Sequence, residues 1–121
     1  MLRTILKSKI HLATVTQTEL TYEGSITVDS AILKVADIYP HEKVEVLNLN
    51  NGQRIETYCI EGEAGSGVVC LNGPAARLAC VGDKVIILSY VLVDDNQAHK
   101  TKSRRVYLDG YNRIVDRKEG R

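Results

Sequence analysis

The sequence predicts a small, mainly β domain, and three observations lead to this prediction. Apolar and polar residues alternate with a period of two in several short segments, as in strands that bury one face. Only one segment has the apolar spacing of a helix. Glycine-containing turns separate the segments, and the 121 residues are the size of one domain. Six or seven short strands in one domain favour a closed or nearly closed β barrel.

The first two predicted strands cover residues 9–16 and 20–28. Lys9 and His11 share one face of the first strand, because side chains two residues apart point the same way. The dipeptide Gly24-Ser25 lies within the second strand or at a break in it. A glycine inside a strand pattern commonly marks a bulge or a close approach of another backbone.

A helix and a hairpin are predicted next. One of residues 29–30 caps the helix, which Pro40 ends. Strands over residues 43–49 and 53–60 then flank Asn51-Gly52, a pair that favours a type I′ turn with positive φ at both positions.

Shorter sequence patterns predict the secondary structure of the rest of the chain. Residues 68–71 form a short buried strand, and residues 72–76 make a tight connection into a helical turn. Residues 84–93 are almost continuously apolar and β-branched, which favours a strand buried on both sides. Residues 106–108 form a last short strand. The charged tail, residues 113–121, is expected to be frayed.

Composition excludes several classes of protein. Sixteen Lys and Arg balance fifteen Asp and Glu, so no overall field attracts nucleic acid or a membrane surface. The basic segment 99–105 has no aromatic residues among its charges, which favours a solvated loop. The start of the chain lacks the apolar run of a secretory signal, and no segment is long enough to span a membrane. A cytoplasmic protein is predicted.

The cysteines and histidines do not suggest a metal site. The three cysteines have no C-x-x-C spacing and lie in or beside apolar segments, so we expect them to be reduced and buried. The three histidines are far apart in the chain and have no paired ligand spacing.

The dipeptide Gly24-Ser25 is the candidate functional centre. Glycine leaves its carbonyl open to close approach, so the Ser25 hydroxyl could attack it and convert the amide into an ester. Elimination would then leave dehydroalanine, and hydrolysis would leave a pyruvoyl group, an electrophilic ketone that serves as an electron sink. Gly-Ser is also common in ordinary turns. The dipeptide alone does not decide between these interpretations.

When the dipeptide is taken together with the motifs around it, the chain resembles the pyruvoyl-dependent aspartate 1-decarboxylases, bacterial enzymes that make β-alanine for pantothenate. The resemblance covers residues 3–93 and rests on five motifs that follow one another along the chain. They are Arg3-Thr4-x-Leu6 with Lys9 and His11, Leu20-x-Tyr22-Glu23-Gly24-Ser25, Asn51-Gly52-x-Arg54-x-x-Thr57-Tyr58, Asn72-Gly73-x-Ala75-Ala76 and Val81-Gly82-Asp83. Such a set, in this order and at these separations, is highly specific.

The resemblance implies a mainly β fold, a double-psi β barrel with short helices, in a single domain over residues 1–121. Each protomer would cleave itself between Gly24 and Ser25 into a β chain, residues 1–24, and an α chain, residues 25–121. Four of each chain would form a homotetramer with active sites between neighbouring subunits. The implied enzyme is a cytoplasmic carboxy-lyase that converts L-aspartate to β-alanine and CO2 for pantothenate and coenzyme A biosynthesis. It would need no metal and no external cofactor, and would bind neither nucleic acid nor membrane.

The resemblance also implies roles for individual residues. Ser25 would become the pyruvoyl group that forms a Schiff base with the substrate amine, and Tyr58 would return a proton after CO2 leaves. Gly24 and Thr57 would take part with Ser25 in self-processing, and Arg54 would pair with a substrate carboxylate. The substrate-binding residues implied in full are Lys9, His11, Arg54, Thr57, Asn72, Gly73, Pro74 and Ala75, with Tyr22 completing the polar wall.

Two questions about this site arise from the sequence. In an extended strand the Cα atoms of Arg54 and Tyr58 are about 13 Å apart, so contact with one small substrate needs curvature or side chains from different subunits. Pro74 has no N–H, so an anion at that position must use neighbouring amides.

One alternative from another class is a non-catalytic β-barrel module that binds a partner or a small ligand. It would keep Gly24-Ser25 as an uncut bulge. The sequence also leaves open whether cleavage needs a helper protein and whether the substrate is aspartate or glutamate. A short pocket closed by Arg54 favours the shorter acid.

Overall fold

The computed structural model describes residues 1–120 as strands joined by short helices and turns. The strands are β1 (Leu2–Thr14), β2 (Gln17–Glu19), β3 (Ser25–Asp29), β4 (Lys43–Asn48), β5 (Arg54–Gly62), β6 (Val69–Asn72), β7 (Lys84–Asp94), β8 (Ser103–Leu108) and β9 (Ile114–Gly120). The helices are α1 (Ser30–Ala36), α2 (Asp95–Ala98) and the 3-10 helix η1 (Gly73–Leu78).

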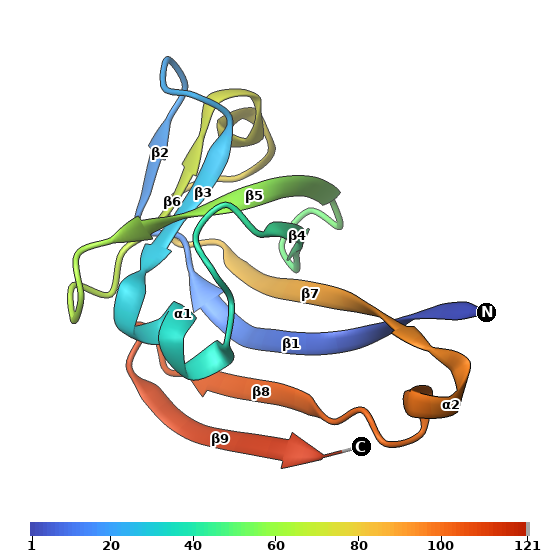
Figure 1. Ribbon diagram of the computed structural model, residues 1–121. Helices are drawn as coiled ribbons and strands as arrows, with labels where there is room; N and C mark the ends of the chain where they lie inside the picture. Colours follow the sequence, from blue (N-terminus) through green and yellow to red (C-terminus); the bar gives the residue numbers. More distant parts are fainter. Residues whose placement is uncertain (121) are drawn as a thin grey trace.

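All the described strands belong to one sheet, in the order β2-β6-β3-β5-β4-β7-β1-β8-β9. Figure 1 shows β2, β3 and β6 together at one end, and β7, β1, β8 and β9 as neighbours at the other. The prediction of a mainly β fold with short helices is confirmed. The strand pairing runs as an open series from β2 to β9, and the double-psi barrel stays a prediction.

Strand β1 is the longest and pairs with two neighbours. It is antiparallel to β7 over most of its length and parallel to β8 from Ser8 to His11. Two register shifts interrupt the β7 pairing, and Leu12 has a φ of 62° at the second. Such bulges bend a strand, so β1 curves and its two ends lie in different parts of the sheet.

The predicted strand over residues 20–28 is divided in two. Strand β2 ends at Glu19 and β3 begins at Ser25, and the Tyr22 N–H donates to the Glu19 carbonyl at 3.3 Å in the turn between them. The Gly24-Ser25 bond therefore lies at a break in the strand, the second of the two predicted alternatives.

Helix α1 begins where β3 ends. The Asp29 carboxylate accepts a hydrogen bond from the Ala31 N–H at 2.8 Å, which caps the first turn. Ile32, Leu33 and Ala36 are buried, and Asp37 takes the left-handed conformation that ends the helix. The predicted helix is confirmed, although it ends before Pro40 is reached.

The turn between β4 and β5 differs from the prediction. A type I′ turn needs positive φ at both central residues, but of Asn51 and Gly52 only Gly52 has it, at 76°. The Gly52 N–H donates to the Asn48 carbonyl at 2.9 Å, which closes a longer loop. The Asn51 amide instead donates to the Leu78 carbonyl at 2.8 Å. The type I′ prediction was wrong because this contact with η1 holds Asn51.

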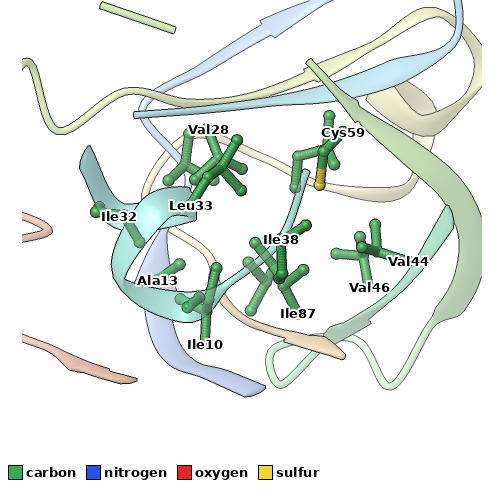
Figure 2. Packing of buried hydrophobic residues seen from close by; sticks show 14 of the residues in the cluster. Ile10, Ala13, Val28, Ile32, Leu33, Ile38, Val44, Val46, Cys59 and Ile87 are labelled. Atoms are coloured by element: carbon green, nitrogen blue, oxygen red, sulfur yellow. The ribbon is translucent and has the colours of Figure 1, made fainter. Parts of the chain in front are cut away.

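The hydrophobic core lies between the curved sheet and α1. Figure 2 shows side chains from the helix, including Leu33, meeting Ile10 of β1, Val28 of β3 and Ile87 of β7. These residues are at most 2% exposed. Burial and the nearby Glu42 raise the pKa of the Cys59 thiol to about 12. All three thiols are free, but Cys80 is exposed, so the prediction of burial was wrong for that residue.

Strand β7 is buried only in its first half. Val85 and Ile87 are fully buried, whereas Tyr90 and Leu92 are 41% and 64% exposed in a single chain. The prediction that residues 84–93 are buried on both sides was therefore wrong beyond Ser89, where β7 pairs with the exposed start of β1.

The C-terminal tail is ordered into a strand up to Gly120. Strand β9 pairs antiparallel with β8 from Ser103↔Gly120 to Leu108↔Ile114, so the prediction of a frayed tail was wrong for these residues. Arg121 lies outside the described part of the chain. Most β9 side chains are exposed, which explains why the sequence there has no apolar alternation.

Asn112 anchors the β8–β9 turn to the rest of the domain. It is 3% exposed, with a φ of 59°. Its side-chain oxygen accepts from the Thr14 N–H at 2.7 Å, and its amide donates to the carbonyls of Thr14 and Gly67 at 2.8 and 2.7 Å. One side chain thus joins the end of β1, the β5–β6 loop and the C-terminal hairpin.

We expect Asn112→Ala to lower the free energy of unfolding by about 1–3 kcal/mol, because it leaves buried backbone groups without partners. Urea denaturation measures the change. Tyr111→Ala, in the same turn but 83% exposed, is the control and should stay within about 0.5 kcal/mol of the parent. Equal midpoints for Asn112→Ala and the parent would contradict the anchoring role.

Candidate functional site

The site is built around Ser25, the first residue of β3. Strand β3 lies between β5 and β6, with Ile26 opposite Cys59 and Ser25 opposite Asn72. Ile26 points into the core, so Ser25 and Thr27 share the other face of the strand. Ser25 is 1% exposed, which keeps its hydroxyl out of solvent in the continuous chain.

The Asn72 side chain holds this face together. Its amide donates to the hydroxyls of Ser25 and Thr27, both at 2.9 Å. The Asn72 oxygen accepts from the Cys70 thiol at 3.2 Å. Burial, with the charge of Glu19, raises the pKa of the Cys70 thiol, so the thiol keeps its proton and the amide nitrogen is the atom directed at Ser25.

The backbone at Gly24 is in close contact with η1. Gly73 has a φ of 65°, and a Cβ there would lie 2.8 Å from both Cα and N of Gly24. A Cβ on Gly24 would lie 3.4 Å from Cδ of Pro74. Glycine is therefore needed at position 73 for the two backbones to meet. The Ser25 hydroxyl donates to the Glu23 carbonyl at 3.1 Å across this turn.

Strand β5 carries two of the predicted residues close to the start of its pairing with β3. The parallel β3–β5 ladder starts at Ile26↔Cys59, so Tyr58 directly precedes this pair on β5 as Ser25 does on β3, and Thr57 shares the face of Cys59. The Tyr58 ring lies edge-on to His41, with centroids 6.0 Å apart. Thr57 and Tyr58 are both half-buried.

Arg54 lies at the start of β5 and faces one acidic partner, Glu45. Its Nη1 is 3.4 Å from a Glu45 carboxylate oxygen. Burial and Glu45 raise the pKa of the neighbouring Tyr90, and Arg54 opposes that rise. Glu45 is the strand partner of Glu56 rather than of Arg54. The Arg54 guanidinium therefore reaches along β5 toward Tyr58, which shortens the distance between Arg54 and Tyr58.

An open groove runs along the outer face of β4, β5 and β7 near this cluster. Its volume is about 510 Å³, and its lining includes Lys43, Glu45, Glu56 and Tyr90. Lys43 is the strand partner of Tyr58. The groove therefore lies beside the part of β5 that is between Arg54 and Tyr58.

Lys9 and His11 are not beside Ser25 in this chain. They lie on β1, and β5, β4 and β7 separate β1 from β3 in the sheet. The His11 ring is edge-on to Tyr107 of β8 at 5.5 Å. Burial and the charge of Lys9 lower the pKa of His11. Tyr22 is 56% exposed in the turn before Gly24.

The structure thus brings together part of the predicted site. The residues placed against the Gly24-Ser25 bond are Asn72, Gly73 and Pro74, whereas Thr57 and Tyr58 lie on the neighbouring strand β5 just before its first pair with β3, Ile26↔Cys59. Ala75 is buried against the core, Arg54 is farther along β5, and Lys9 and His11 are on another part of the sheet.

Sequence reasoning missed Thr27 and Cys70. Each lies two residues from a predicted member of the site, Ser25 or Asn72, and hydrogen bonds to the Asn72 side chain. The period of two that places them on the same face was visible in the sequence, but the pairing of β3 with β6 was not.

The described residues give no support for a metal site or a membrane-spanning helix. Within residues 1–120, no three His, Cys, Asp or Glu side chains gather as a metal site. Over the same residues, no helix has the length and apolar character needed to cross a membrane.

Comparisons with known proteins give one consistent result. Residues 1–115 match the family model described as aspartate decarboxylase. The aspartate 1-decarboxylase of Thermoanaerobacter pseudethanolicus is 53% identical over 116 residues, covering 96% of this chain and 99% of the relative. That of Pelotomaculum thermopropionicum is 54% identical over 120 residues, covering 99% and 91%. That of Listeria welshimeri is 56% identical over 114 residues, covering 94% and 90%.

We expect Lys9→Gln to raise the pKa of His11 only part of the way to its ordinary value. The substitution removes the repulsion between the charges but leaves the larger effect, burial. NMR titration of the His11 ring measures the change. Lys43→Gln, whose ammonium pairs with Glu56 on β5, is the control and should leave the titration unchanged. A pKa of His11 that does not move in Lys9→Gln would contradict this account.

Proposed function

The chain belongs to the aspartate decarboxylase family and is an enzyme, and we propose that it converts L-aspartate to β-alanine and CO2 after cutting its own backbone between Gly24 and Ser25. The observation that carries the proposal is the position of this bond. It joins a turn to the first residue of β3 and is held against Asn72 and Gly73. A scission there interrupts no strand.

Both sides of the bond are held independently of it. Before the bond, β1 pairs with β7 and β8, and β2 pairs with β6. After it, β3 pairs with β5 and β6. A β chain of residues 1–24 and an α chain of residues 25–121 would therefore keep their strand partners, and residue 25 would stay in place as a new chain end.

The residues around position 25 fit a pyruvoyl group. Asn72 offers an amide donor 2.9 Å from the Ser25 oxygen, and the lack of a Cβ at Gly73 leaves room for the backbone of Gly24. When present, a pyruvoyl group supplies an electrophilic ketone that takes the substrate amine and withdraws electrons from the bond to the departing carboxylate. No external cofactor and no metal is then required.

In self-processing, Ser25 would attack the Gly24 carbonyl. Its hydroxyl is bonded to the Glu23 carbonyl and to Asn72 in the continuous chain, so it would turn from Glu23 toward Gly24. Thr57, on β5 two residues before the first β3–β5 pair at Cys59, would donate a hydrogen bond to the oxygen of that carbonyl as charge develops on it.

In the decarboxylation, Arg54 and Tyr58 would act on the substrate from β5. Arg54 would bind a carboxylate, exchanging Glu45 for the substrate, since guanidinium groups pair well with carboxylates. The Tyr58 hydroxyl would donate the proton that replaces CO2. The backbone of Gly73 and Ala75 would line the pocket around Pro74, which lacks an N–H.

The site would be completed by a neighbouring copy. Lys9 and His11 lie on β1, away from Ser25 of the same chain, so they would serve the site of another subunit in a homotetramer of four α and four β chains. Exposed apolar side chains such as Leu20, Tyr39 and Leu92 support such burial. We propose a double-psi barrel protomer that acts in the cytoplasm, in the supply of β-alanine for pantothenate and coenzyme A.

Intact-mass spectrometry of freshly denatured protein tests the self-cleavage. We expect fragments of 24 and 97 residues, the larger one lighter by one ammonia than its serine form. Ser25→Ala should give one uncut chain, because no hydroxyl is available for attack. Ser66→Ala, on the β5–β6 loop, is the control and should still be cut. A parent chain that stays whole and inactive would favour the non-catalytic binding module.

We expect Tyr58→Phe to cut itself normally but to lose most β-alanine production, by about 100-fold or more, the usual contribution of a positioned proton donor. Mass spectrometry reports the cleavage, and chromatography of the product reports the activity. Tyr111→Phe changes an 83% exposed ring and is the matched control. Full activity in Tyr58→Phe would refute the role of proton donor.

A further inference from the structure

The chain contains the dipeptide Asn-Gly twice, at residues 51–52 and 72–73, in two different surroundings. Asn51 and Gly52 are exposed in the loop between β4 and β5, and a Cβ on Gly52 would have no atom within 4 Å. Asn72 is 2% exposed, and a Cβ on Gly73 would lie 2.8 Å from Gly24. The same pair of residues is therefore open to solvent at one position and enclosed at the other.

An Asn-Gly pair can change its own covalent structure, because glycine has no side chain to hinder the approach of its backbone nitrogen. That nitrogen attacks the Asn side-chain Cγ and forms a new N–C bond. The Cγ–Nδ2 bond breaks, and ammonia leaves with the proton from the glycine nitrogen. The product is a five-membered succinimide, and water opens it at either carbonyl to leave aspartate or isoaspartate.

The contacts that oppose this attack at Asn51 lie in an exposed loop, residues 49–54. The Gly52 N–H donates to the Asn48 carbonyl at 2.9 Å. The Asn51 side chain accepts from the Gln53 N–H at 2.9 Å and donates to the Leu78 carbonyl at 2.8 Å. Because opening an exposed loop costs much less free energy than separating strands, the Gly52 nitrogen becomes free to react during brief openings.

At Asn72 the sheet blocks the same attack. The Asn72 amide donates to the hydroxyls of Ser25 and Thr27, and its oxygen accepts from the Cys70 thiol. Asn72 ends β6, where it is the strand partner of Ser25. Freeing its side chain requires the separation of β3 from β6, which costs a large part of the free energy of unfolding.

We propose that Asn51 is a site of spontaneous covalent modification, and that the fold directs this reaction to residue 51 and away from residue 72. In the folded protein Asn51 turns slowly into aspartate or isoaspartate, whereas Asn72 keeps its amide beside Ser25. The inference goes beyond the proposed function, because Asn51 and Gly52 have no part in it. The reaction needs no cleavage at Ser25, so the failure of one proposal does not decide the other.

The modification removes a contact that holds the end of η1. The Asn51 and Asn48 amides both donate to the Leu78 carbonyl, at 2.8 and 3.2 Å, and the Asn48 amide also donates to the Asp83 carboxylate at 2.8 Å. A carboxylate at position 51 has no proton to donate at neutral pH. It also adds a second negative charge near Asp83. The end of η1 is therefore held less firmly after the reaction.

The test is incubation of the purified protein at mildly alkaline pH, which favours loss of the proton from the glycine nitrogen. Peptide mapping with mass spectrometry then separates asparagine, aspartate and isoaspartate at each position. We expect residue 51 to react at least about tenfold faster than residue 72, because only the loop must open. The same incubation in concentrated guanidinium chloride is the control, and both pairs should then react at similar rates. An unmodified residue 51 in the folded protein, or equal rates there at the two positions, would overturn the proposal.

Two variants of Asn51 separate the chemistry from its effect on η1. Asn51→Gln lengthens the side chain, so the attack would need a six-membered ring, and the acidic form that isoelectric focusing detects in the aged parent should be absent. The same acidic form in Asn51→Gln would contradict the assignment to residue 51. Asn51→Asp carries the product charge from the start and should unfold at a lower urea concentration than the parent. An unchanged urea midpoint would contradict the loss of support for η1.

Discussion

The close contact between the backbones of Gly24 and Gly73 is the constraint on which the site depends. Only a residue without a Cβ can occupy position 73, since a side chain there would lie 2.8 Å from Gly24. The contact sets Gly24 directly before the first ladder pair, Ser25↔Asn72. The Asn72 amide is thereby brought to the Ser25 hydroxyl, and its orientation follows from the Cys70 thiol on its other side. A geometric requirement at one glycine thus determines the polar contacts of Ser25.

The far end of β3 is held just as firmly, and this keeps the site in place. The Asp29 carboxylate caps α1 through the Ala31 N–H and also accepts from the N–H groups of Gly65 and Gly67, at 3.0 and 2.9 Å. The β5–β6 loop is therefore tied to the strand that begins with Ser25. Leu33 of α1 packs against Val28 in the core (Figure 2). A cut before Ser25 would leave all these contacts intact.

The local elements could be predicted from sequence, because period-two alternation, a helix cap and turn residues act over short distances. The helix after Asp29 and the break at Gly24 are examples. Errors arose where distant contacts decide the structure. Asn51 is held by Leu78, and β9 is ordered by pairing with β8 although most of its side chains face solvent. For the site, motifs identified Ser25 and Asn72, but only the β3–β6 register reveals that Thr27 and Cys70 share their face.

The two cations best placed to meet a carboxylate, Arg54 and Lys9, have different surroundings. Arg54 already faces Glu45, so a ligand carboxylate must displace that of Glu45. The ligand then gains only the difference between the free energies of the two ion pairs. Lys9 is beside Arg105 and is separated from Glu45 by Leu88, so a ligand there relieves repulsion as well as forming its own hydrogen bonds. Both positions are partly screened by water, which limits either gain. At equal exposure, Lys9 should attract an anion more strongly than Arg54, and Arg54 should instead discriminate among ligands by geometry.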